Sequence, residues 1–156
     1  MNIQRSSGIL LHITSLPGNY GIGTLGDEAY DFVNKMKRAG LKYWQILPFG
    51  PVNPALGFSP YSSASTFAGN YMFISLEKLK RDFLPTLVID THEFEASHFV
   101  PFDEVIAHKK GILKTAFEMF IKKPAKPKLA EYKAFCMEHT YWLDDFAVFG
   151  GDNNEF

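Results

Sequence analysis

Two short, continuously apolar runs lie in the first third of the chain. The first covers residues 8–13 (GILLHI), and the second covers residues 43–47 (YWQIL) and ends at Pro48. Apolar runs of this length are typical of strands that are buried on both faces, as in a parallel sheet. We therefore predict one buried strand at each run.

A helical pattern separates the two runs. Asp27 is suited to the start of a helix over residues 27–39, and Gly40 is suited to the position just after its end. Four apolar residues recur at helical spacing in this stretch: Ala29, Tyr30, Val33 and Met36. Strand, helix and strand in this order predict a βαβ unit, in which the strands are parallel and the crossover is right-handed.

The pattern is weaker after the second run. Residues 59–70 (SPYSSASTFAGN) form a small, polar loop that carries two aromatic residues. For residues 71–79 we predict a strand at the beginning and a short helix at the end. Residues 82–102 have little period and two prolines, so we predict an excursion outside the main sheet.

Two further helices are predicted in the second half. Asp103 is a candidate cap for a helix over residues 103–121, in which His108 is predicted to be solvated beside Lys109 and Lys110. Residues 122–128 (KKPAKPK) are predicted to be a solvated linker. A third helix is predicted over residues 129–149, followed by a polar tail over residues 150–156.

Composition narrows the class of protein. The 156 residues are 46% hydrophobic and 15% aromatic, which excludes a disordered protein. A net charge of -1 suggests no charge-driven affinity for nucleic acid or anionic lipid. The single cysteine excludes an internal disulfide framework and a cysteine-rich zinc site, and the histidines have no metal-like spacing. With no signal-peptide pattern and no membrane-spanning run, the expected location is the cytoplasm.

Several motifs together resemble a known enzyme family. GILLHITSLPGNYGIGTLGDEAYDFV, KYWQILPFGP and SPYSSASTFAGN are similar to the amino-terminal region of the 4-alpha-glucanotransferases, the amylomaltases or disproportionating enzymes of glycoside hydrolase family 77. The likeness is dense from about residue 5 to residue 79 and continues more weakly through FDEVIAHKKGILKTAF and EHTYWLDDFAVF. One departure is Tyr71, where the family commonly has a proline after the asparagine of FAGN.

The resemblance implies a TIM (β/α)8 barrel with inserted subdomains, of which this chain would supply an incomplete part. Residues 1–79 would be the start of the barrel, residues 80–149 a mostly helical inserted segment, and residues 150–156 a polar tail. The family transfers segments of 1,4-alpha-glucan to glucose or an oligosaccharide by a retaining double displacement. Its catalytic carboxylates lie on later strands, so we expect none in this chain, no cofactor, no metal and no activity of the chain alone.

The resemblance also indicates which residues approach the glucan. In barrel enzymes the site lies at the carboxyl ends of the strands. Tyr61 is therefore expected to line the donor site, with Ser59 setting its loop. His12, at the end of the first strand, and Asn70 are assigned to the site or to a structural hydrogen bond with equal weight. Phe67 is expected to anchor the loop in the core.

Two alternatives remain open. In the first alternative, the chain is a stand-alone module that binds glucan or a protein partner without catalysis. In the other, it is part of a related amylase-type barrel. SLPGNYGIG and SPYSS favour the glucanotransferase, whose partners would be maltooligosaccharides or alpha-glucan, with neither nucleic acid nor membrane involved.

Overall fold

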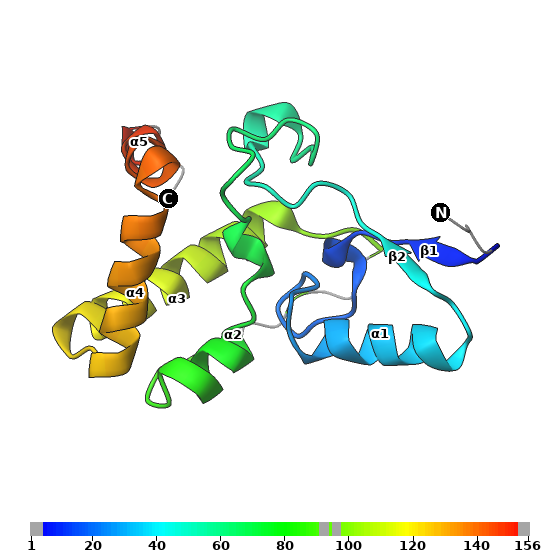
Figure 1. Ribbon diagram of the computed structural model, residues 1–156, viewed down its shortest axis with the longest axis horizontal. Coiled ribbons are helices and arrows are strands. Elements are labelled where there is room, and N and C mark those ends of the chain that lie inside the picture. The colour runs from blue at the N-terminus through cyan, green and yellow to red at the C-terminus, as the bar shows by residue number, and fades with distance from the viewer. Residues whose placement is uncertain (1–4, 91–93, 95–97, 153–156) are drawn as a thin grey trace.

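The computed structural model describes residues 5–90, 94 and 98–152, and it shows a helix-rich α/β fold. A small sheet and helix α1 lie at one end of the molecule, and helices α4 and α5 lie at the other, with α3 between them (Figure 1). Among the described residues, no helix is both long and apolar enough to cross a membrane.

The sheet has two parallel strands, β1 (Gly8–Leu10) and β2 (Tyr43–Gln45). Gly8 pairs with Tyr43, and Leu10 pairs with Gln45. A side chain at Gly8 would meet the Tyr43 carbonyl oxygen at 2.4 Å, so the close approach of the strands requires glycine there. The parallel pair was predicted, but each strand is shorter than its apolar run.

The apolar runs are typical of strands that need cover on both faces, and the predicted helices are too few to supply it; one face of the sheet is exposed in this chain. Leu10 is 58% exposed and Tyr43 is 62% exposed. Trp44 packs on the covered side, against a cluster that includes Ala29 of α1 and Phe73, and its ring meets Phe32 of α1 edge-on at 4.9 Å between centroids. Successive side chains of a strand point to opposite faces, so the face opposite Trp44 stays open to solvent.

Helix α1 (Asp27–Arg38) confirms the helical pattern between the strands. Ala29 and Met36 are its buried residues. Gly40 has a φ of 76°, a left-handed conformation that ends the helix at little cost because glycine has no Cβ.

The strand predicted at residue 71 is wrong, whereas the short helix after it is confirmed. Tyr71–Phe73 form a 3-10 turn (η3), and Leu76–Lys78 form helix α2, which continues as a π-helix (η4) over Leu79–Phe83. The side chain of Ser75 accepts a hydrogen bond from the Lys78 amide at 3.2 Å. Such caps favour helical turns over an extended strand.

The segment that follows agrees with an excursion outside the sheet. Its described residues after η4, namely 84–90, 94 and 98–101, contain no helix and no strand. The fold returns to regular structure at α3 (Phe102–Lys122). Asp103 does not cap this helix, because Pro101 holds the cap position and Asp103 lies in the first turn.

The predicted third helix is two helices. They are α4 (Lys126–Glu138) and α5 (Thr140–Asp152), separated at His139. The predicted linker shrinks to residues 123–125, because a proline is tolerated in the first turn of a helix and α4 starts with Lys126 and Pro127. The last helix runs to Asp152, beyond the predicted end at residue 149, and residues 153–156 of the predicted tail lie outside the described part.

Buried apolar residues form three clusters in the described part of the chain. One lies between α1 and the turn at η3, and includes Ile13, Leu16, Ala29 and Phe73. Another joins α2 to α3 through Leu76, Leu87, Ile112 and Ala116. The third contains Ile22, Met72 and Val105. The segment from Met72 to Leu76 contributes to all three clusters and is therefore central to the packing.

Candidate functional site

The loop of residues 59–70 follows β2 and is organised by its own serines. The Ser59 hydroxyl accepts a hydrogen bond from the Tyr61 amide at 3.4 Å. The Ser65 hydroxyl accepts hydrogen bonds from the amides of Phe67 and Ala68 at 3.2 and 3.1 Å. Serine side chains that bond nearby amides in this way stabilise turns. The loop therefore has a defined shape without a strand or helix in it.

Tyr61 projects from this loop into solvent, where its side chain is 73% exposed. Phe58, just before the loop, anchors its start. Phe58 has a positive φ of 57°, and its ring stacks on that of Phe102 of α3 at 4.6 Å between centroids. A left-handed conformation is costly for a bulky residue, so this stacking offsets a local strain. Tyr61 is thus presented outward by an anchored loop.

Phe67 does not lie in the core, contrary to the prediction. Its side chain is 60% exposed, and its ring contacts Tyr141 and Trp142 of α5, at 5.4 and 6.1 Å between centroids. Phe67 nevertheless connects the loop to α5.

Asn70 ends the loop and serves a turn. It is only 5% exposed, and its side-chain oxygen accepts a hydrogen bond from the Met72 amide at 2.9 Å. Its backbone amide donates a hydrogen bond to the Phe49 carbonyl at 2.9 Å. Of the two roles given equal weight for Asn70, the structure displays the structural one.

His12 follows β1 and contacts the same turn. Its ring packs edge-on against Phe73 at 5.5 Å between centroids, and the Phe73 amide donates to the Asn70 carbonyl at 3.0 Å. Burial lowers the pKa of His12 below its ordinary value, so the ring is neutral at neutral pH. Its Nδ1 atom is buried and has no hydrogen-bond partner among the described residues.

Lys109, which was not predicted as a site residue, hydrogen-bonds the backbone of the turn around Phe73. Lys109 of α3 is fully buried, and its ammonium donates hydrogen bonds to the carbonyls of Met72 and Ile74, the latter at 2.8 Å. Burial lowers the pKa of Lys109 to about 8. The signal was in the sequence, because Val105, Lys109, Ile112 and Ala116 follow one helical stripe.

The prediction that His108 is solvated is wrong. Its side chain is 7% exposed, and its Nε2 lies 2.6 Å from a carboxylate oxygen of Asp90. Its ring stacks on Tyr20 at 5.9 Å and meets Phe94 edge-on at 5.6 Å between centroids. His108 joins α3 to two segments that are distant in sequence, which is a structural role.

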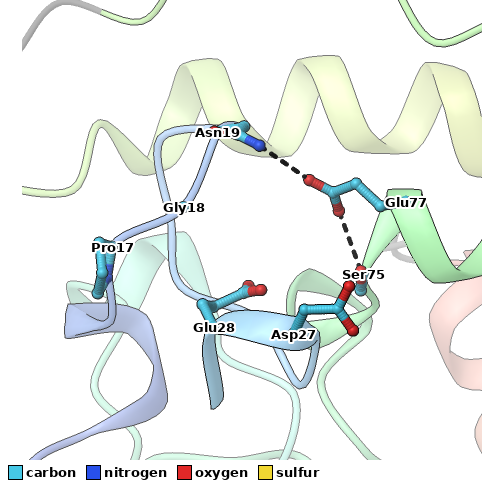
Figure 2. A pocket seen from close by; sticks show the side chains of 7 residues that line it. All are labelled: Pro17, Gly18, Asn19, Asp27, Glu28, Ser75 and Glu77. Carbon is cyan, nitrogen blue, oxygen red and sulfur yellow. Dashed lines mark hydrogen bonds between the residues drawn. The ribbon is translucent and has the colours of Figure 1, made fainter. Parts of the chain in front are cut away.

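A separate hollow of about 440 Å³ lies beside the start of α1 (Figure 2). Its residues are Pro17, Gly18, Asn19, Asp27, Glu28, Ser75 and Glu77. The carboxylates here are engaged: Glu77 accepts hydrogen bonds from Asn19 and Ser75, Glu28 accepts from Thr24, and Asp27 pairs with Arg81. In the described part of the chain, no three His, Cys, Asp or Glu side chains are placed to share a metal ion.

The predicted site residues therefore fall into two groups. Ser59 and Tyr61 lie together on the exposed loop, whereas His12 and Asn70 meet at the Phe73 turn. In the described part of the chain, no hydrogen bond or ring contact joins Tyr61 to His12. Residues 59–70 connect the first group to Asn70, whereas His12 comes from the segment after β1.

Comparison with known proteins gives one consistent result. A family model for the 4-alpha-glucanotransferases of glycoside hydrolase family 77 matches residues 11–154. A 4-alpha-glucanotransferase of Aquifex aeolicus is 41% identical over 146 residues, which are 94% of this chain and 28% of that protein. One of Thermus thermophilus is 41% identical over 150 residues, which are 96% of this chain and 29% of that protein.

The structural comparison agrees. An amylomaltase from Streptococcus agalactiae, solved in complex with acarbose, matches 98% of this chain with a TM-score of 0.82 and 34% identity, and the match covers 30% of that chain. The chain thus spans less than a third of the length of these relatives. It belongs to the 4-alpha-glucanotransferases of glycoside hydrolase family 77.

Proposed function

We propose that this chain provides the first βαβ unit of a TIM barrel in an enzyme that transfers segments of 1,4-alpha-glucan, and that its loop of residues 59–70 contacts the glucan through Tyr61. The observation that carries this proposal is the exposure of Tyr61, 73%, on an anchored loop that follows β2 in a chain with an amylomaltase fold. Parallel barrels bind substrates at that end of their strands.

The role assigned to Tyr61 follows from its chemistry. A tyrosine ring offers an apolar face to the C–H groups of a glucose unit, and its hydroxyl can bond a sugar hydroxyl. Ser59 sets the loop by accepting the Tyr61 amide. The acarbose bound by the related amylomaltase is consistent with an oligosaccharide ligand for the complete enzyme.

His12 and Asn70 are assigned supporting roles in this proposal. Asn70 shapes the turn that receives the loop, because its side chain caps η3. His12 supports the same turn, because its ring packs against Phe73 and its Nδ1 is buried. The nucleophile and the acid/base lie outside this chain, in the cytoplasmic enzyme that it would complete.

A graft tests the proposal. The matched stretch of the Thermus thermophilus relative is replaced by this chain, and disproportionation of maltotriose is measured. The graft is expected to be active, and Tyr61→Ala is expected to lower its kcat/KM by at least about tenfold, which is roughly 1.4 kcal/mol of transition-state binding. The isolated chain is expected to be inactive in the same assay.

Tyr30→Ala is the matched control. Tyr30 is 62% exposed but lies on α1, away from the loop, so its removal should leave kcat/KM within about twofold. If both tyrosine variants keep their activity, or if Tyr61→Ala lowers only the melting temperature, Tyr61 has a packing role and the proposed contact is wrong.

A further inference from the structure

Another hollow, of about 340 Å³, lies between η4, α3 and the start of α4. Its lining is mostly apolar and includes three side chains of α3 and two of η4, namely Leu113, Ala116, Phe120, Leu79 and Phe83. The stretch between α3 and α4 adds two lysines, Lys123 and Lys128. We call this cavity the basic hollow.

The apolar part of the basic hollow is continuous with the core. Ala116 belongs to the buried cluster that joins α2 to α3, and Leu79 and Leu113 pack against that cluster. Phe83 is nevertheless 52% exposed. An apolar group that displaces water from such a preformed lining gains affinity through the hydrophobic effect.

The charged part of the lining has one sign. Lys123 and Lys128 are its charged residues, and none of the described residues that line the hollow carries a carboxylate. The Lys128 ammonium lies 4.5 Å from the centroid of the Phe83 ring, so a positive charge stands beside the apolar lining.

One carboxylate outside the lining competes for this charge. Glu131 pairs with Lys128 at 2.8 Å, but the Glu131 side chain is 62% exposed. Ion pairs exposed to this extent contribute little to stability. A ligand carboxylate in the hollow can therefore replace Glu131 as the partner of Lys128.

The size of the hollow limits its occupant. Cavities that bind small molecules have volumes of about 300–1,000 Å³, and the basic hollow is near the lower end of that range. A small molecule suits it better than a helix of a partner protein. The hollow also gives a role to the basic stretch KKPAKPK, residues 122–128, because Lys123, Ala125 and Lys128 of this stretch line it.

We propose that the basic hollow binds a small carboxylate with an apolar body, of the kind represented by a straight-chain fatty acid of medium length. The alkyl chain lies on the apolar lining from α3 and η4, and the carboxylate accepts hydrogen bonds from the ammonium groups of Lys123 and Lys128. None of the described lining residues belongs to the loop of residues 59–70, so this site does not depend on the proposed contact of Tyr61 with glucan.

Urea unfolding of the chain at submicromolar concentration, followed by tryptophan fluorescence, tests the site with hexanoate, octanoate and decanoate. A ligand that binds the folded chain raises its free energy of unfolding, and the dependence on ligand concentration gives Kd. The affinity should rise about threefold to fourfold for each added CH₂ group. Octanamide has the same length without the charge and should bind at least about fivefold more weakly than octanoate.

A second measurement uses the graft into the Thermus thermophilus relative. Decanoate should slow hydrogen exchange of the amides in Leu79–Phe83 at least about threefold, because the ligand covers this segment. Unchanged exchange in the presence of saturating decanoate would contradict the proposed position of the ligand.

Single substitutions locate the site. Lys123→Gln and Lys128→Gln should each weaken octanoate binding at least about fivefold, since each removes one ammonium. Ala125→Trp should abolish binding, because a large side chain at this exposed lining position occupies the hollow. Lys126→Gln is the matched control: it removes the same charge from the same stretch, at an exposed position that does not line the hollow. It should leave the affinity within about twofold.

Circular dichroism checks that each variant folds, and the probe series on the unmodified chain does not depend on any of them. Equal affinity for octanoate and octanamide would overturn the proposal, because the lysines would then have no part in binding. An equal loss of affinity in Lys126→Gln and Lys128→Gln would also overturn it. If the chain binds phosphatidylglycerol vesicles through the same lysines and does not bind free octanoate, the occupant is a membrane surface and the proposed site is wrong.

Discussion

Lys109 shows how one buried charge organises a neighbourhood. Its ammonium bonds two carbonyls of the segment between the loop and α2, those of Met72 and Ile74. Burying a charged group is costly unless hydrogen bonds compensate for the lost water. The lowered pKa reports that cost, since burial favours the neutral amine.

The pH dependence of stability should report this residue directly. The pKa of Lys109 is about 8 in the folded chain and near the ordinary 10.5 in the unfolded chain. Between these pH values the unfolded chain holds a proton that the folded chain releases, so stability rises with pH. Relative to Lys109→Met, the free energy of unfolding should increase by roughly 3 kcal/mol from pH 7 to pH 11.

Urea unfolding followed by tryptophan fluorescence, at submicromolar concentration, measures this difference. At pH 7 the variant should also be less stable by about 1–3 kcal/mol, because two carbonyls lose their donor. Lys114→Met, at an exposed position of the same helix, is the control and should change the free energy of unfolding at pH 7 by less than about 0.5 kcal/mol. Parallel curves for all three proteins would contradict the lowered pKa of Lys109.

His108 and Lys109, neighbours on α3, show what could and could not be predicted about single residues. His108 was predicted to be solvated because it lies beside two lysines, yet the side chains of His108 and Lys109 are both buried. Position 109 belongs to the apolar stripe of α3, and this spacing is available in the sequence. The contact of His108 with Asp90 cannot be found in that spacing, because the two residues meet only through the path of the chain between them.

At the scale of elements, glycines at different places in the backbone have opposite consequences. Gly111 lies inside α3, and a Cβ added there would meet no atom within 4 Å. Gly40 ends α1 with a φ of 76°. Glycine weakens a helix interior because of its backbone freedom, but it suits a left-handed turn.

A pair of alanine substitutions tests this difference. Gly111→Ala should raise the free energy of unfolding by about 1 kcal/mol, since alanine restricts the unfolded chain and fits the open space. Gly40→Ala should lower it by about 1 kcal/mol, because alanine is strained at positive φ. Urea unfolding at pH 7 measures both, and changes of the same sign would contradict the argument.

Local chemistry also explains which elements could be predicted. α1 was predictable because the apolar spacing indicates a helix and Gly40 marks its end at the same place. The strand expected at residue 71 failed because the side chains of Asn70 and Ser75 cap turns there, which outweighs an apolar run. The continuous third helix failed at His139, whose carbonyl accepts the amide of Leu143 at 2.9 Å and so begins α5.

At the scale of the molecule, the described residues contain one two-stranded parallel sheet, and one of its faces is exposed to solvent. The sequence motifs predicted the family and the parallel pair, which the comparisons and the fold confirm. The apolar runs predict strands that need cover on both faces, and the chain has too few predicted helices to cover both, so the exposure of Leu10 and Tyr43 agrees with the sequence.

The chain alone should therefore associate without a fixed stoichiometry. Large exposed apolar groups and open strand edges promote such contacts. Size-exclusion chromatography with light scattering, at tens of micromolar chain, should show a broad mass distribution, and Leu10→Lys should narrow it. A monodisperse monomer with a sharp thermal transition would instead indicate a self-sufficient domain and favour a stand-alone binding module.

The order in which the strands are made has a consequence for synthesis in the cell. The cluster that joins α1 to the sheet includes Phe73, so β1, α1 and β2 can complete this core once Phe73 has left the ribosome. At typical rates of about 5–20 residues per second, the rest of this chain takes on the order of ten seconds to emerge. Leu10 and Tyr43 of the nascent polypeptide are thus exposed throughout that interval. During this time chaperones and other chains can both bind these two side chains.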